Sequence, residues 1–180
     1  MELSESQLRY PIGKAAIPDH ITEKDISNWI QVIEDFPSEL EALVSPLTEA
    51  QLDTPYRDGG WTVRQVVHHL ADSHMNSFIR FKWTLTEEQP VIKAYFEERW
   101  AELPDGKSAP IGPSLDQLKS LHSRWTILLR ALSAADRKRT FIHPEGNKQV
   151  SLEKNTGIYA WHSKHHYAHI ANLLQRKGWL

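Results

Sequence analysis

The sequence contains no cysteine among its 180 residues. This absence excludes a disulfide framework, a cysteine-ligated zinc finger and a protein thiol nucleophile. No apolar run approaches the length of about 20 residues that a membrane-spanning helix needs. The first 20 residues also lack the basic segment and apolar segment of a secretory signal peptide. We therefore expect a soluble, cytoplasmic protein without a membrane partner.

The sequence also lacks an excess of charge of one sign, since it contains 21 basic and 23 acidic residues. This balance excludes the basic footprint that nucleic-acid binding requires. A chain of this length with 40% hydrophobic residues can bury the core of one domain. We predict a single domain over residues 1–180. Residues 1–20 contain Pro11, Gly13 and Pro18 and show no period, so we expect an extended arm that lies on this domain.

Apolar residues recur at helical spacing in four long segments. Thr62 and Ser114 each open a segment with a capping-box pattern, and Gly178 follows the last segment as a C-terminal cap. Pro37 lies inside the first segment and is expected to kink it. The sequence thus predicts an all-α four-helix bundle, with helices over 22–47, 62–86, 114–133 and 151–177.

Two connections between these helices carry further patterns. Residues 89–113 contain four prolines and predict a long irregular connection between the second and third long helices, with a short helix near 96–100. A loop of this length in a small domain often borders a functional site. Residues 141–152 are expected to form a small hairpin that turns at 145–147.

Histidine is the residue type that stands out, because seven of the ten histidines lie within 68–74 and 162–169. In the second window four histidines share the core-facing stripe of the last helix. Each buried imidazole needs partners for both nitrogens, and a shared metal ion would provide them. His162 and His166 are four residues apart, which lets their nitrogens converge on one ion. The alternatives are a polar, hydrated interior or a surface histidine cluster.

A third ligand is expected from the second helix, which offers His68, His69 and His74. The helical period places His74 inside the apolar stripe, His69 at its edge and His68 roughly opposite. Periodicity alone thus ranks His74 first and His69 second. This ranking does not decide which of the two binds the metal. His69 also begins a polar row, made of His69, Ser73, Asn76 and Arg80.

Two motifs carry a family resemblance. GGWTVRQVVHHLADSH and WHSKHHYAH resemble the DinB-like superfamily of metal-binding four-helix bundles. Together with YPIG and TPYRDGG, they resemble the YfiT-type metal-dependent hydrolases of bacilli, from about Tyr10 to Trp179. The resemblance implies that His69, which precedes the Leu-Ala pair, binds the metal with His162 and His166 of the H-x-x-x-H motif. His74 is then assigned to the core, and His68 becomes an outer group near the site or on the surface.

This resemblance implies one divalent transition metal per chain, with zinc expected and nickel as the alternative. Three imidazoles and an open position are typical of a catalytic site that activates water, which favours a metal-dependent hydrolase acting on a small molecule. The first alternative is a bacillithiol-type thiol S-transferase, since a metal also deprotonates a bound thiol. The second is a binding or stress-response module without turnover. A homodimer is the assembly that we consider.

Residues beside the ligands supply candidates for the remaining roles. Asp72 is a candidate for proton transfer, and an ordinary surface carboxylate is the competing interpretation. Asn76 and Arg80 can bind substrate carboxylates, unless Arg80 forms a structural salt bridge. Trp61 follows a glycine pair and is expected at the mouth of the site.

His165 and His169 compete for the open coordination position. His169 lies one turn beyond His166, whereas His165 lies at the edge of the stripe. A fourth histidine ligand would close the site and make the metal structural.

Overall fold

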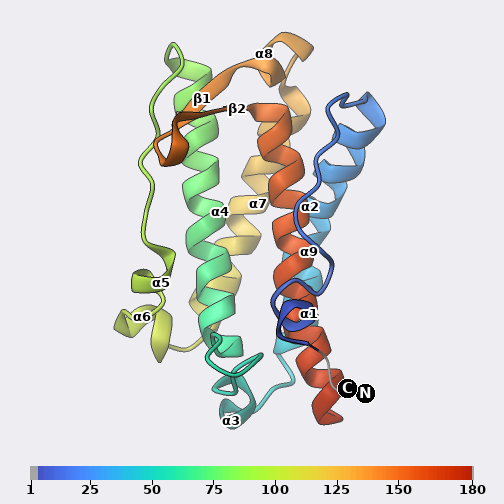
Figure 1. Cartoon of the computed structure of the whole chain (residues 1–180), viewed down its shortest axis with the longest axis vertical. Helices are drawn as coiled ribbons and strands as arrows, with labels where there is room; N and C mark the ends of the chain where they lie inside the picture. Colours follow the sequence, from blue (N-terminus) through green and yellow to red (C-terminus); the bar gives the residue numbers. More distant parts are fainter. Residues whose placement is uncertain (1–3, 180) are drawn as a thin grey trace.

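The computed structural model describes residues 4–179, in which four long helices run side by side (Figure 1). Helices α2 and α4 each contact α7 and α9, so α2 lies diagonally across the bundle from α4. The expected four-helix fold is confirmed. None of the helices in residues 4–179 combines the length and the hydropathy of a membrane span. The four helices are α2 (Glu23–Val44), α4 (Val63–Thr86), α7 (Gly112–Ala131) and α9 (Leu152–Lys177).

Local sequence determines where α4 and α9 begin and end. The Thr62 hydroxyl accepts from the Gln65 backbone N–H at 3.1 Å, and the Gln65 side chain accepts from the Thr62 N–H at 3.0 Å. Ser151 caps the start of α9, and Gly178 adopts a left-handed φ of 66° after its last turn. Both pairs of boundaries agree with the sequence predictions, because caps are local interactions.

The predicted start of α7 is wrong. The helix begins at Gly112, and no side chain caps it. Pro113 fits the first turn, where its missing N–H costs no hydrogen bond. The Ser114 hydroxyl instead lies 2.7 Å from Nδ1 of His68 on α4. Pro37 lies inside α2, which continues past it to Val44.

Short elements fill the connections. The expected hairpin is confirmed, with Thr140 of β1 paired to Ser151 of β2. The long connection after α4 carries the expected short helix near residue 100 and one more, which was not expected. The short elements are α3 (Glu49–Leu52), α5 (Glu97–Trp100), α6 (Pro104–Lys107), α8 (Ala134–Lys138), β1 (Thr140–His143), η1 (Glu145–Asn147) and β2 (Lys148–Ser151).

The arm before α2 is not extended throughout, because α1 (Glu5–Arg9) forms a short helix that Ser4 and Gln7 cap. The arm runs along the outside of the bundle (Figure 1). Residues 1–3 of the expected arm lie outside the described residues.

Polar side chains fasten the long connection to α4. The buried Arg64 pairs with Asp53 and Glu49 and donates to the Ala109 carbonyl at 3.0 Å. Gln65 donates to the Ala101 carbonyl at 2.9 Å. The connection is therefore held as a wall beside α4.

The core consists of two apolar clusters with histidines between them. One cluster contains Phe36 and Leu70, and the other contains Phe81 and Trp125. His74 is fully buried, and its ring packs against Phe36 of one cluster and Trp125 of the other. The bundle thus carries a polar layer across its middle.

Gly157 on α9 allows close packing against α2 and the arm. A Cβ there would lie 2.9 Å from Cδ1 of Ile17 and 2.9 Å from the Trp29 ring. We expect Gly157→Ala to lower the free energy of unfolding by about 1–3 kcal/mol, because the helix would be overpacked. Gly112→Ala is the control, since no atom lies within 4 Å of its Cβ position. Urea unfolding checks both variants, and equal stabilities would contradict this role of Gly157.

Candidate metal centre

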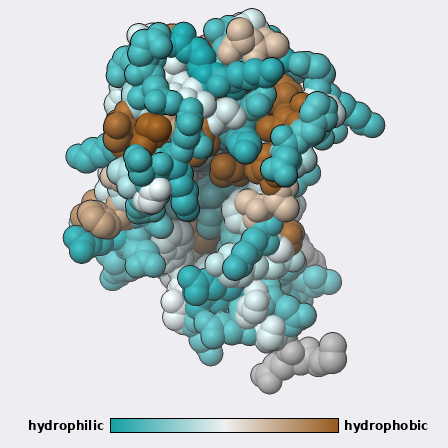
Figure 2. Space-filling view, turned by 45° about the horizontal axis from the view of Figure 1, so that its top comes forward, coloured by the Kyte–Doolittle hydropathy of each residue, from teal (hydrophilic) through white to brown (hydrophobic). Residues whose placement is uncertain are grey.

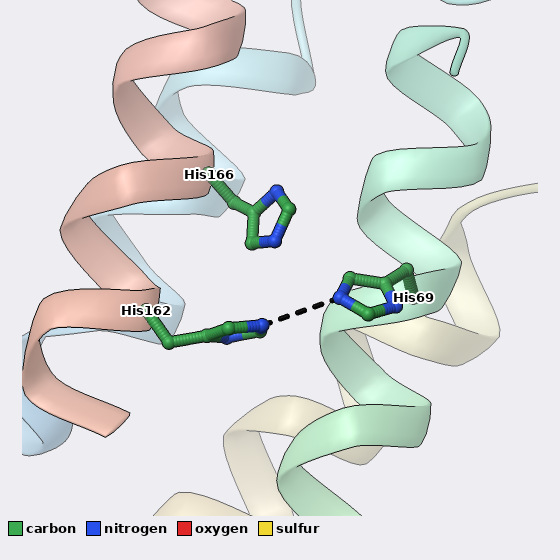
Figure 3. A group of neighbouring side chains, drawn as sticks. All are labelled: His69, His162 and His166. Atoms are coloured by element: carbon green, nitrogen blue, oxygen red, sulfur yellow. Dashed lines mark hydrogen bonds between the residues drawn. The ribbon is translucent and has the colours of Figure 1, made fainter. Parts of the chain in front are cut away.

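Three histidines converge between α4 and α9. One ring nitrogen from each of His69, His162 and His166 lies within 4.8 Å of the other two (Figure 3). His69 comes from α4, and the other two come from consecutive turns of α9. Nε2 of His69 lies 3.2 Å from Nε2 of His162. Among residues 4–179 no carboxylate joins this cluster.

A chain of hydrogen bonds runs from His162 into the core. Nδ1 of His162 lies 3.1 Å from Nε2 of His74, and Nδ1 of His74 lies 2.7 Å from Nε2 of His122. The chain ends at α2, where Nδ1 of His122 lies 2.5 Å from the Ile33 carbonyl oxygen.

The carbonyl at the end of this chain determines where the protons lie. A carbonyl oxygen only accepts, so Nδ1 of His122 carries a proton and its Nε2 accepts. Nδ1 of His74 therefore donates to His122, and Nδ1 of His162 donates to His74. Nε2 of His162 consequently keeps a lone pair, which is directed toward His69.

A second chain has the same effect on His166. Nε2 of His169 lies 3.1 Å from the Arg9 carbonyl oxygen of the arm, so it donates. Nδ1 of His169 then accepts from Nδ1 of His166 at 3.3 Å. Nε2 of His166 is therefore left with a lone pair. Through these two chains, two backbone carbonyls leave two nitrogens of the cluster unprotonated, which is the form that binds a metal.

Burial keeps these imidazoles neutral. It lowers the pKa of His69 to about 3 and the pKa of His122 and His169 to about 4. Burial also lowers the pKa of His162 and His166 well below 6.5, and neighbouring histidines lower both further. Neutral imidazoles are the form that transition metals bind, and the tautomers of His162 and His166 are fixed by the two chains, so the donor set fits a divalent ion.

The competing histidines have other contacts. Both nitrogens of His169 already have partners, and His165 does not join the cluster. His68 is buried on another side of α4, where it contacts Ser114 and the Ala109 carbonyl. It is therefore neither a surface group nor a neighbour of the cluster. His74 is a core residue that also contacts His162.

Of the remaining candidate site residues, two line the cleft beside the cluster and two do not. Trp61 packs on His69, with ring centroids 4.6 Å apart. Arg80 also lines the cleft. Asn76 does not line it, and its amide donates to the Asp72 carbonyl at 2.9 Å. Asp72 is also absent from the lining. Burial of its carboxyl group, and to a smaller extent the negative charge of Asp105, raises the pKa of Asp72 to about 6.

The cleft beside the cluster has a volume of about 820 Å³. Its walls come from α4, α9, the arm, the loop before α4, the long connection and the hairpin. Figure 2 shows a hollow in the surface with hydrophilic side chains inside it and apolar side chains on either side. One face of α4 supplies Gln65, His69, Ser73 and Arg80.

Sequence reasoning missed two parts of this centre. His122 is a single histidine on α7, and its position between Leu118 and Trp125 on the apolar stripe was the available signal. The Arg9 carbonyl has no sequence signal, because every residue carries one.

The buried histidines predict acid destabilisation of the metal-free protein. Their folded pKa values lie below the ordinary value of 6.5, so the unfolded chain alone binds protons as the pH falls below about 6.5. Each such histidine lowers stability by about 1.4 kcal/mol per pH unit, down to its folded pKa. We expect the urea midpoint of chelator-treated protein to fall steeply between about pH 7 and about pH 5. A midpoint that does not change over this interval would contradict the neutral, buried state.

Comparison with known proteins agrees with this geometry. YfiT of Bacillus subtilis (strain 168) is 54% identical over 172 residues, which cover 96% of this chain and 97% of YfiT. A protein of Bacillus mycoides (strain KBAB4) is 56% identical over 172 residues, covering 96% of this chain and 98% of that protein. The solved YfiT structure, described as "a probable metal-dependent hydrolase with an unusual four-helix bundle topology", superposes with a TM-score of 0.94. It is 53% identical, and the match covers 97% of this chain and 99% of that one.

A more distant structure shares the fold alone. The mycothiol-dependent maleylpyruvate isomerase superposes with a TM-score of 0.64 at 15% identity, over 86% of this chain and 63% of that one. The DinB superfamily pattern matches residues 33–170. From this match and the full-length relatives, the chain belongs to the DinB superfamily.

Proposed function

We propose that this protein is a metal-dependent hydrolase that binds one divalent ion through Nε2 of His69, His162 and His166. The observation that carries the proposal is the pair of histidine chains ending at the Ile33 and Arg9 carbonyls. They leave Nε2 of His162 and Nε2 of His166 with lone pairs beside His69. The description of YfiT as a probable metal-dependent hydrolase supports the same function.

We propose zinc as the ion. Three imidazoles without sulfur or carboxylate ligands suit zinc, and nickel is the competing ion. Catalytic zinc sites typically have three protein ligands and one open position. When bound, such an ion acts as a Lewis acid and makes water a nucleophile near neutral pH.

The protein itself contributes ligand orientation and partial exclusion of water. His74 and His169 hold the rings of His162 and His166 through the hydrogen bonds described above. Trp61 covers one side of His69 at a centroid distance of 4.6 Å. We propose that Trp61 lies against the substrate, because it also lines the cleft. A cleft of about 820 Å³ suits a small-molecule substrate.

Three further properties stay proposals. The chain acts as one domain, because the arm completes the histidine chain through Arg9. The homodimer and the cytoplasmic location rest on the sequence alone.

Replacing each ligand tests the metal site. We expect His69→Ala, His162→Ala and His166→Ala each to lose most bound metal, measured per chain in protein purified without an affinity tag. His74→Phe keeps all three ligands but removes the acceptor of His162, so metal affinity should fall by about 10- to 100-fold. Metal should also raise the melting temperature, because only the folded chain brings the ligands together.

His68→Ala is the control for these variants, since His68 is buried in the same helix but lies away from the cluster. It should lose stability and keep its metal. Full occupancy in His69→Ala, or equal metal loss in His68→Ala, would overturn the ligand assignment.

An activity assay tests the reaction. We expect zinc-loaded protein to hydrolyse p-nitrophenyl acetate, and chelation or His162→Ala to abolish the activity. Conjugation of 1-chloro-2,4-dinitrobenzene with bacillithiol, measured in parallel, tests the thiol S-transferase alternative. Conjugation without hydrolysis would replace our proposal with that function. Metal binding without either reaction would indicate a non-catalytic module.

A further inference from the structure

Arg80 is a buried cation for which the described residues provide no partner. Its side chain is 9% exposed, and its Nε is buried without a hydrogen-bond acceptor. The ion pairs formed within residues 4–179 do not include it. Arg64, on the same helix, is also buried, yet it pairs with Asp53 and Glu49. The fold thus satisfies one buried arginine of α4 and leaves the other unsatisfied.

An unsatisfied buried charge lowers the stability of a protein. A structural salt bridge, which was the competing interpretation of Arg80, is not formed among the described residues. A guanidinium that lines a cleft in this condition is available to an anion that binds there during function.

Arg80 lies in the same cleft as the histidine cluster. It shares one face of α4 with His69 and Ser73, and all three side chains line the cleft. Arg80 follows His69 by 11 residues, so their Cα atoms are about 16 Å apart along the helix axis. Both side chains lean toward the N-terminus of the helix, and the arginine side chain is the longer of the two, so the guanidinium lies somewhat closer to the imidazole than this. One extended molecule can therefore reach both groups.

The other charged groups near Arg80 do not neutralise it. The acidic residues that line the cleft are exposed and form no ion pair with Arg80, and they are Glu97, Glu98, Glu102 and Glu145. His143 of the hairpin also lines the cleft. Burial, and secondarily Arg80, lowers the pKa of His143, and an imidazole in either protonation state offers no negative charge to Arg80.

We propose that Arg80 binds an oxyanion of the substrate, a carboxylate or a phosphate, while the scissile bond lies at the histidine cluster. The proposal rests on the proposed hydrolase function and deepens it, because it gives the substrate an anionic group remote from the reacting bond. A guanidinium offers a planar fork of donors that matches either oxyanion. The fork fixes the position of an extended substrate along the cleft.

Binding is tested first, with the Nε–H resonance of Arg80 as a local reporter in metal-loaded protein. We expect suberate and inorganic phosphate to shift this resonance, and the better of the two identifies the preferred oxyanion. Octanoate also presents a carboxylate but has no second charge, so it reports on carboxylate binding alone. The same titrations on His162→Ala, which lacks a metal ligand, show whether Arg80 binds anions independently of the metal. A resonance that none of these anions shifts would overturn the proposal.

Substrate preference is tested next. We expect wild-type protein to hydrolyse mono-p-nitrophenyl suberate with a higher kcat/KM than p-nitrophenyl octanoate, an ester with the same chain length and no remote charge. Arg80→Gln should lower kcat/KM for the charged ester by about 10- to 100-fold more than for the uncharged ester. Arg80→Lys should lose less, because it keeps the charge without the fork. Arg124→Gln is the matched control, since Arg124 is an exposed arginine over Phe78 that does not line the cleft.

The two proposals fail in different ways. If neither ester is hydrolysed but the Arg80 resonance still shifts with anions, the hydrolase function is wrong and the anion subsite stands. If both esters are hydrolysed equally by wild type and Arg80→Gln, the subsite is wrong and the hydrolase stands. Removal of an unpaired buried charge should also raise the melting temperature of Arg80→Gln. A lower melting temperature would indicate a structural role for Arg80.

Discussion

The structure depends on one constraint, which is that each buried imidazole must find a donor or an acceptor for two nitrogens. The fold meets this constraint for His74, His122 and His169 by linking histidines end to end, whereas Nδ1 of His165 is buried without a partner. Each chain finishes on a main-chain carbonyl, at Ile33 in α2 or at Arg9 in the arm. These ends determine which nitrogens carry protons, and they leave Nε2 of His162 and Nε2 of His166 bare beside His69.

The same constraint explains the division of the core. The apolar clusters on either side of the histidine layer supply the burial that stabilises the bundle. The histidines between them contribute specificity instead, because a displaced imidazole would leave an unsatisfied nitrogen. Stability and site geometry are thus assigned to different layers of one bundle. This arrangement lets the cleft contain features that lower stability, such as the unpaired Arg80.

Much of this architecture could be predicted from sequence, where the information is local. Thr62 with Gln65, and Ser151 with Gly178, define α4 and α9 because helix caps involve residues only a few positions apart. Ser114 fitted the same rule, yet its hydroxyl contacts His68, which lies far away in sequence. Helical periodicity favoured His74 as a ligand and could not distinguish a ring at the cluster from a ring directly behind it. The resemblance to a known family selected His69, which lies in the cluster.

The Arg9 carbonyl has a consequence for how this site can be studied. Its oxygen belongs to the main chain, so any side chain at position 9 presents the same acceptor to His169. Residue 9 can therefore vary among related proteins without loss of this contact, and a scan of single substitutions would not detect it. Changes to the backbone itself would detect it, such as removal of the arm or replacement of a peptide bond by an ester. Part of this candidate metal centre is thus determined by the path of the main chain rather than by the identity of a residue.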